Sequence, residues 1–225
     1  QRIALRVAGP IVAIGILASL FTAVFYYFLV YRNQPSATRG FELPGTHDRR
    51  RIRELLAKIH HLDKAHHHFE LGDIYFQQGK LEKAEACYRA ALQREPDDLD
   101  TVAHLGHCLL RQNRAIEARP HLEKVVGVDG KHEYGHTLMA LAETLGQLNE
   151  TDAAMGAWQQ VLAQNSYARA RVQLAELFLK QKRKGEARAL LDEVLADDAY
   201  APTFPRSQER VWVRRAKGLL PAANE

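Results

Sequence analysis

The stretch LGDIYFQQGKLEKAEACYRAALQREP, from Leu71 to Pro96, carries the pattern that decides the fold. Each half spaces its apolar residues three or four apart, as an amphipathic helix does, and Gly79 lies in the polar turn between the halves. Small residues at Gly72 and Ala84 allow close approach of two helix backbones, while Tyr88 is large enough to fill the space around them. The stretch therefore predicts two helices joined by a tight turn.

The same pattern occurs four times in the chain. The copies begin near Ala65, Leu99, Gly135 and Ala168, at spacings of 34, 36 and 33 residues. Corresponding positions hold the pairs Leu71-Gly72, Leu105-Gly106, Leu141-Ala142 and Leu174-Ala175, the turn residues Gly79, Asn113, Asn149 and Lys182, and the large residues Tyr88, Leu122, Trp158 and Leu191. Since no copy can bury its apolar face alone, the sequence predicts an all-α solenoid of stacked helix pairs.

These columns resemble the tetratricopeptide repeat family, whose signature the stretch ending at Pro96 follows most fully. The resemblance covers four helix-turn-helix repeats, at residues 65–98, 99–134, 135–167 and 168–201, within a repeat domain of residues 65–203. Only the first copy closes with proline. Residues 204–225 are expected to form a C-terminal capping helix and tail, with Trp212, Ala216 and Leu219 on the face that closes the last repeat.

A long apolar segment precedes the repeats. From Val7 to Tyr31 the chain has 25 consecutive uncharged residues, more than the roughly 20 that cross a bilayer as a helix. This predicts an N-terminal flank and transmembrane helix over residues 1–31. More Lys and Arg follow the segment than precede it, which favours cytoplasmic repeats. Because the sequence opens on Gln1, this count omits any upstream residues, and a periplasmic or lumenal orientation stays open.

Residues 32–48 read as a linker, and residues 49–64 as a basic amphipathic helix. Its apolar stripe comprises Ile52, Leu55, Leu56, Ile59 and Leu62. The basic residues Arg49, Arg50, Arg51 and Arg53 either contact anionic lipid headgroups or form a solvated charged face.

The overall pI of about 9.1 suggests nucleic-acid binding until the charges are located. Residues 1–64 carry a net charge of +6 and residues 206–225 carry +3, whereas residues 65–205 carry −5. The excess basic charge therefore flanks the apolar segment and recurs on the C-terminal helix. No nucleic-acid partner is predicted.

One motif suggests catalysis. Residues 132–136, HEYGH, match the H-E-x-x-H pattern that holds zinc when it lies on a helix. Here it follows GVDGK at a repeat boundary, and Gly135 disfavours a helix, so a zinc-dependent hydrolase or metal carrier is only a minor alternative. Cys87 and Cys108 are expected to be buried, inert thiols. With no other catalytic motif, the prediction is a protein that is not an enzyme and has no catalytic, cofactor-binding or metal site.

The resemblance implies a concave groove lined by the first helices of successive repeats. Carried over copy by copy, the partner-binding residues would be His66, Phe69, Glu70, Asp73, Gln77, His104, His107, Arg111, His136, Glu143, Gln147, Arg169, Gln173, Glu176 and Lys180. Family members that clamp the C-terminal carboxylate of chaperones use Lys and Asn in the first copy, where this chain has Phe69 and Asp73. The groove is therefore expected to hold a different peptide or helix, unless its polar residues are merely solvated.

These observations lead to a membrane-anchored adaptor or scaffold that binds a protein partner in its groove and assembles a complex at the membrane. The alternative is a periplasmic or lumenal assembly factor for an envelope or cytochrome complex.

Overall fold

The computed structural model describes residues 46–200 and 203–224. The predicted transmembrane helix of residues 7–31 and nearly all of the linker lie outside this range. Within the described range, no helix is long and apolar enough to cross a membrane. The chain divides into two compact units after Glu54, and the second unit, from Leu55 onward, contains the repeats.

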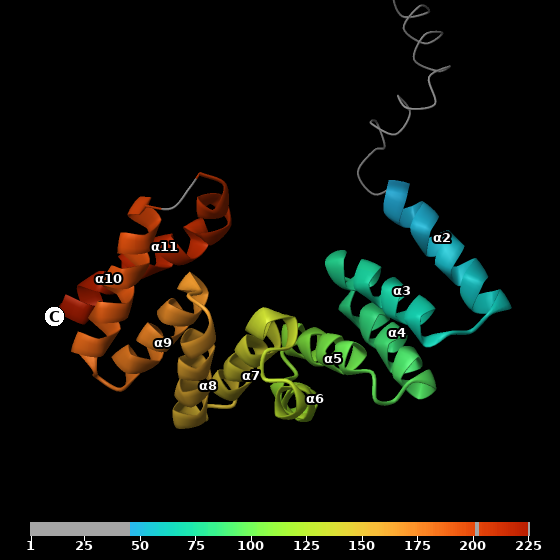
Figure 1. Ribbon diagram of the computed structural model, residues 1–225, viewed down its shortest axis with the longest axis horizontal. Coiled ribbons are helices and arrows are strands. Elements are labelled where there is room, and N and C mark those ends of the chain that lie inside the picture. The colour runs from blue at the N-terminus through green and yellow to red at the C-terminus, as the bar shows by residue number, and fades with distance from the viewer. Residues whose placement is uncertain (1–45, 201–202, 225) are drawn as a thin grey trace, which may run out of the picture. The chain divides into compact units, whose positions relative to one another are not determined.

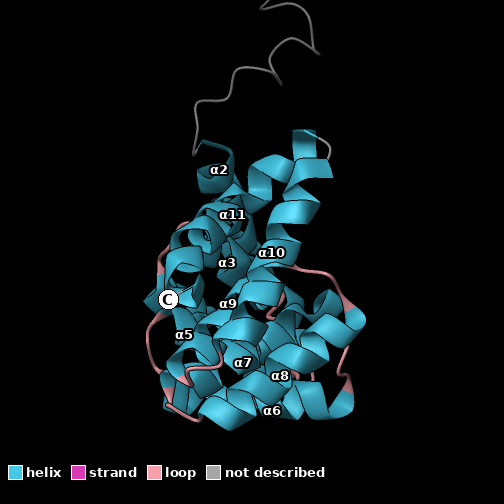
Figure 2. Ribbon diagram, turned by 90° about the vertical axis from the view of Figure 1, so that its left-hand side faces the viewer, coloured by secondary structure: helices cyan, strands magenta, loops and turns pink. Residues whose placement is uncertain are grey.

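The described residues form helices joined by short loops, and none of them forms a strand (Figures 1 and 2). The first helix of the described range is α2 (Thr46–His61). Four helix pairs follow: α3 (Ala65–Gln77) with α4 (Leu81–Arg94), α5 (Leu99–Arg111) with α6 (Ala115–Val128), α7 (His136–Gln147) with α8 (Thr151–Gln164), and α9 (Ala168–Lys180) with α10 (Lys184–Tyr200). A 3-10 turn, η2 (His132–Gly135), precedes α7, and α11 (Thr203–Asn224) is the last of the described helices. From α3 on, each helix packs against the next, so the described fold is an all-α helical repeat.

The four turn positions expected from the sequence share one backbone conformation. Gly79, Asn113, Asn149 and Lys182 have φ angles of 73°, 60°, 61° and 62°, in the left-handed region. Glycine and asparagine adopt this conformation readily, whereas a lysine there is strained. The same tight turn therefore joins the two helices of every pair.

The glycines of the first helices lie against large side chains of the second helices. A Cβ atom added at Gly72 would be 2.7 Å from Cε1 of Tyr88, and one added at Gly106 would be 2.7 Å from Cδ2 of Leu122. Close packing thus brings each of these two glycines onto a large residue of the partner helix. Both large side chains are fully buried.

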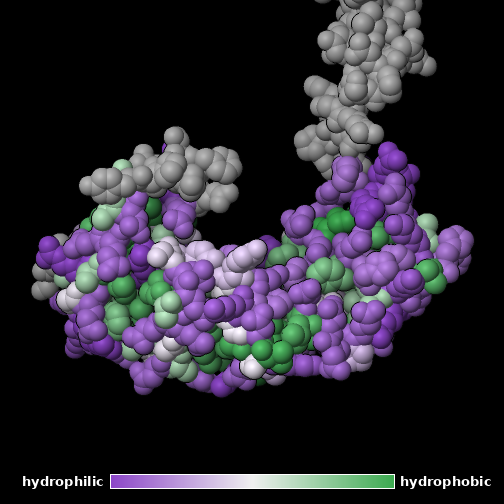
Figure 3. All heavy atoms as spheres, in the orientation of Figure 1, coloured by the Kyte–Doolittle hydropathy of each residue, from purple (hydrophilic) through white to green (hydrophobic). Residues whose placement is uncertain are grey.

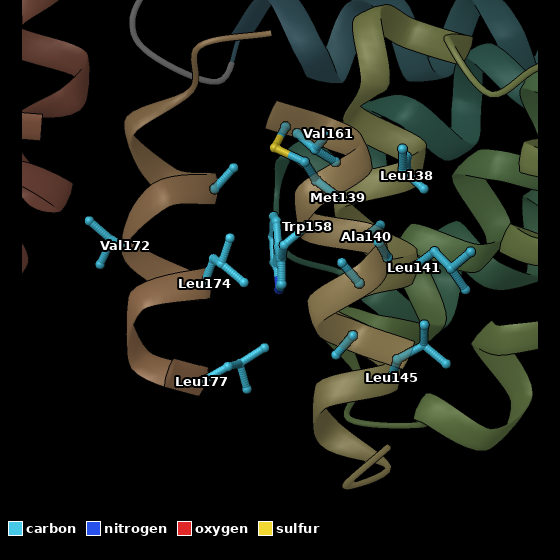
Figure 4. Close-up of a cluster of buried hydrophobic side chains, with 14 of the residues drawn as sticks. Leu138, Met139, Ala140, Leu141, Leu145, Trp158, Val161, Val172, Leu174 and Leu177 are labelled. Carbon is cyan, nitrogen blue, oxygen red and sulfur yellow. The ribbon is translucent and has the colours of Figure 1, made fainter. Parts of the chain in front are cut away.

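The core runs continuously from one helix pair to the next. Trp158 of α8 is 2% exposed and lies between Ala140 of α7 and Leu174 of α9, as Figure 4 shows. One side chain therefore contributes to the packing of two repeats, which is how a solenoid buries surfaces that an isolated pair would leave in water.

The flanking helices bury only part of their predicted apolar stripes. On α2, Leu55 is fully buried, but Leu56 is 49% exposed and Leu62, which lies beyond the helix end, is 55% exposed. The prediction that these two leucines are buried was wrong: Leu55 faces the packed side of the helix while Leu56 is turned toward solvent, and Leu62 follows the last helical residue, His61. At the other end, α11 packs on α9 and α10, with Ala216 buried and Trp212 half-buried.

Candidate binding groove

A groove of about 570 Å³ lies along α5 and α7 in the second and third repeats. Its walls are Phe76 from α3, four residues of α5 and one of the following turn, Glu133 from η2, four residues of α7, and Arg169 from α9. The α5 and α7 residues are His104, His107, Leu110, Arg111, His136, Ala140, Glu143 and Gln147. The face of the repeats seen in Figure 3 is mainly hydrophilic, with apolar patches between polar side chains.

Ten of the fifteen residues predicted for the groove line it or a neighbouring hollow. The groove contains His104, His107, Arg111, His136, Glu143, Gln147 and Arg169. The hollow, of about 340 Å³ along α7 and α9, contains Glu143 and Gln147 together with Gln173, Glu176 and Lys180. The five first-copy residues, His66, Phe69, Glu70, Asp73 and Gln77, line neither of these two sites.

Asp73 instead belongs to a chain of polar contacts beside the groove. Tyr88 donates a 2.7 Å hydrogen bond to Asp73, and His104 donates to the same carboxylate oxygen through Nδ1 at 2.8 Å. The other ring nitrogen of His104, Nε2, donates to Oε1 of Glu133 at 3.0 Å. Phe69 packs against this imidazole, with ring centroids 4.9 Å apart. A single histidine therefore bridges the first repeat, the second repeat and η2.

This geometry favours the charged form of His104. Burial opposes the charge, but the hydrogen bonds to Asp73 and Glu133 outweigh it and raise the pKa of His104 to about 9. The hydrogen bond from His104, with the nearby ring of His107, lowers the pKa of Glu133 far below its ordinary value. At neutral pH the bridge is an imidazolium between two carboxylates.

Glu133 reaches the groove because η2 has an unusual backbone. Glu133, Tyr134 and Gly135 have φ angles of 49°, 57° and 85°, three consecutive residues in the left-handed region. Each non-glycine residue there costs roughly 1–2 kcal/mol. The turn belongs to the copy that is 36 residues long, the longest of the three spacings, so additional chain is available for it.

Contacts on both sides hold η2 in place. His132 is buried, with Nε2 donating to Asp100 at 2.9 Å and Nδ1 lying 2.8 Å from the Thr137 hydroxyl. The Tyr134 carbonyl accepts hydrogen bonds from the Asn165 amide and the Tyr167 hydroxyl, at 3.2 and 3.0 Å.

The HEYGH motif consequently does not lie within one α-helix. His132 is engaged with Asp100 and Thr137, whereas the ring of His136 lies 5.5 Å from that of Tyr167. Over residues 46–200 and 203–224, no group of three or more His, Cys, Asp and Glu side chains could hold a metal ion. The geometry gives no support to the zinc alternative.

Several predicted groove charges already have partners. Arg169 donates through Nε to Glu143 at 3.0 Å, and Arg215 of α11 donates through Nη2 to Glu176 at 2.8 Å. Arg111 is different. The Cζ atom of its guanidinium lies 4.7 Å from the centroid of the Phe76 ring, and its Nη1 donates a hydrogen bond to the Phe76 carbonyl. No carboxylate among the described residues pairs with it.

Sequence reasoning missed Phe76, Leu110, Asn113, Glu133 and Ala140 in the groove wall. The extra length of the second copy was the available signal for Glu133.

Neither cysteine has the surroundings of a reactive thiol. Cys108 is buried and donates to the Leu81 carbonyl, and burial raises the pKa of the half-buried Cys87 to about 11.

Two family models, both for the tetratricopeptide repeat, match the chain over residues 75–142 and 139–202. No curated protein matches the sequence. Among solved structures, the chain is similar to YrrB, a TPR protein with an unusual peptide-binding site, at 16% identity over 77% of this chain and 84% of that one, with a TM-score of 0.62.

Two MamA structures are also similar. MamA from Desulfovibrio magneticus RS-1, from residue 41 to its end, is 17% identical over 74% of this chain and 92% of that one, with a TM-score of 0.63. Another MamA protein is 21% identical over 71% and 85%, with a TM-score of 0.56. At these identities the likeness shows the fold alone.

Proposed function

Residues 75–202 consist of tetratricopeptide repeats, and from this we propose that the protein is a non-enzymatic adaptor that binds a peptide or helix of a protein partner in the groove along α5 and α7. The observation that carries the proposal is the groove itself, about 570 Å³ and lined by both charged and apolar side chains. Such a mixed lining suits a peptide, because apolar contacts supply affinity while a few polar groups set its orientation. YrrB, a similar fold, is a peptide-binding protein.

Charge reversal inside and outside the groove tests this proposal. The groove variant is Arg111→Glu, since Arg111 has no carboxylate partner among the described residues. The matched control is Arg188→Glu on α10, an exposed residue whose one ion pair, with Asp192, is at the surface. In affinity capture from a lysate, the partner should be lost with Arg111→Glu and kept with Arg188→Glu. Capture of the same proteins by both variants would refute groove binding.

The proposal includes a membrane anchor at residues 7–31, supported by the uncharged length of that segment. Contact between anionic lipid headgroups and the basic face of α2 would strengthen membrane attachment. One of the arginines on that face, Arg50, already donates to Glu54 at 2.9 Å. Deleting residues 7–31 should move the protein from the membrane fraction to the supernatant. Retention in the membrane fraction would disprove the anchor.

The repeats are proposed to face the cytoplasm, with the periplasm or lumen as the second possibility. Because Cys108 is buried and Cys87 only half-exposed, a thiol introduced at exposed Gln93 is the better probe. In a Gln93→Cys variant, labelling by an impermeant reagent only after the membrane is opened supports the cytoplasmic orientation. Labelling in intact cells would reverse it.

A further inference from the structure

Glu133 occupies the groove as an anion supplied by the chain itself. Its Oε1 accepts from His104 at 3.0 Å, and its Oε2 lies 3.7 Å from Nε2 of His107. That distance is too long for a hydrogen bond, and the buried Nε2 of His107 has no hydrogen-bond partner among the described residues. The groove therefore receives a carboxylate but leaves one buried ring nitrogen unsatisfied.

The backbone that presents Glu133 is not a relaxed helix. Both Glu133 and Tyr134 have left-handed φ angles, and such strain persists only where the surroundings enforce it. The contacts of His132 and of the Tyr134 carbonyl hold η2 independently of the Glu133 side chain. The carboxylate can thus leave the groove by side-chain rotation while η2 stays in place.

The donor groups on the α5 side of the groove outnumber those that the single carboxylate of Glu133 can pair with. Arg111 follows His107 by four residues on α5, so the two side chains share one face of the helix. The other carboxylate of the wall, Glu143, is engaged by Arg169. Phe76 and Leu110 lie beside Arg111 in the same wall and offer apolar surface next to the unmatched charge.

We propose that this groove binds a carboxylate of a partner peptide between His107 and Arg111, next to an apolar side chain, and that Glu133 is the built-in competitor which the ligand displaces. The inference rests on the proposed function and names the class of partner: a peptide carrying an acidic group beside an apolar residue. The acidic group is either a side chain or a chain terminus, which offer the same chemistry to an arginine and an imidazole.

Three short peptides distinguish a side-chain carboxylate from a C-terminal one. Acetyl-Leu-Glu-amide has only a side-chain carboxylate, acetyl-Leu-Gln with a free C-terminus has only a terminal one, and acetyl-Leu-Gln-amide has neither. Each is titrated into the full chain in a zwitterionic detergent, and the imidazole C–H signals of His104 and His107 are followed by NMR. At least one acidic peptide should shift these signals saturably, and the neutral amide should not.

Variants test the competition. Glu133→Gln keeps the size of the side chain but removes its charge, and should tighten binding of the acidic peptide about threefold or more. Arg111→Gln should weaken it about fivefold. The matched control is Glu123→Gln, an exposed glutamate on α6 that should leave the affinity unchanged. Glu133→Gly, which also relieves the left-handed backbone, provides a second variant if the first is poorly folded.

Equal shifts with the neutral amide, or an affinity that does not rise when Glu133 loses its charge, would overturn the inference. Partner capture that depends on Arg111 without any binding of the acidic peptides would leave the proposed function standing and the inference refuted. If an acidic peptide binds but the groove variants capture the partner as well as the wild type does, the proposed function is refuted instead.

Discussion

Removing the charge of His104 should change how the stability of the repeats depends on pH. His104 is three-quarters buried and donates to Asp73 and Glu133, from the first repeat and from η2. These contacts raise its pKa from 6.5 to about 9. Because one pKa unit corresponds to about 1.4 kcal/mol, the upper limit of the stabilisation is about 3 kcal/mol.

The direction follows from the raised pKa. Below pH 6.5 the histidine is charged in both the folded and unfolded chain, so the stabilisation is fully present. Between pH 6.5 and about 9 the unfolded chain loses the proton first, and the stabilisation falls. Above about pH 9 the folded protein is neutral at this site as well, and the contribution is gone.

Urea unfolding of the full chain at pH 6 and pH 9.5 measures the effect. The wild type should lose about 2–3 kcal/mol between these values through this group, whereas His104→Gln should be less stable at pH 6 and lose much less on going to pH 9.5. His61→Gln, at an exposed position of α2, is the control and should follow the wild type. An unchanged pH dependence in His104→Gln would refute the bridge as a stabilising contact.

Three further changes test the packing and the turns, each read from urea unfolding midpoints. Gly72→Ala would place a Cβ atom 2.7 Å from the ring of Tyr88 and should destabilise the fold by about 1–3 kcal/mol. The control Gly127→Ala, which has nothing within 4 Å of the added Cβ atom, should be neutral or stabilising. Equal effects of the two substitutions would contradict the close packing at Gly72. Trp158→Ala should cost about 3–5 kcal/mol, and a loss under 1 kcal/mol would show that the packing of the third repeat on the fourth does not depend on this side chain. Lys182→Gly should stabilise by up to about 1 kcal/mol because φ is 62° there, and destabilisation would count against a left-handed turn.

The periodic features of the chain were predictable because they depend on local spacing. The helix pairs begin at Ala65, Leu99, His136 and Ala168, beside the starts expected from the repeat columns. Left-handed turns occur where the sequence places a glycine, an asparagine or a lysine between two amphipathic patterns. Because the same type of residue recurs at the same position in four copies, its structural role is clearer than that of any single residue.

The binding groove was predictable only in part. The α5 and α7 residues followed from their register on the helices, but Asp73 proved to be committed to His104 and Tyr88. Arg215, one of the basic residues of the C-terminal helix, pairs with Glu176, 39 residues earlier. Each of these pairings joins residues on different helices, and helical periodicity says nothing about which charges will meet.

The sequence by itself determined that the chain forms stacked helix pairs, because each copy repeats an apolar pattern that it cannot bury alone. It also located the long uncharged segment and the acidic character of the repeats. Only the folded arrangement decided the chemistry of the groove. Three consecutive left-handed residues carry Glu133 onto His104, and one imidazolium then joins carboxylates 60 residues apart in the chain. That outcome depends on backbone conformation and on contacts across repeats, which no single copy encodes.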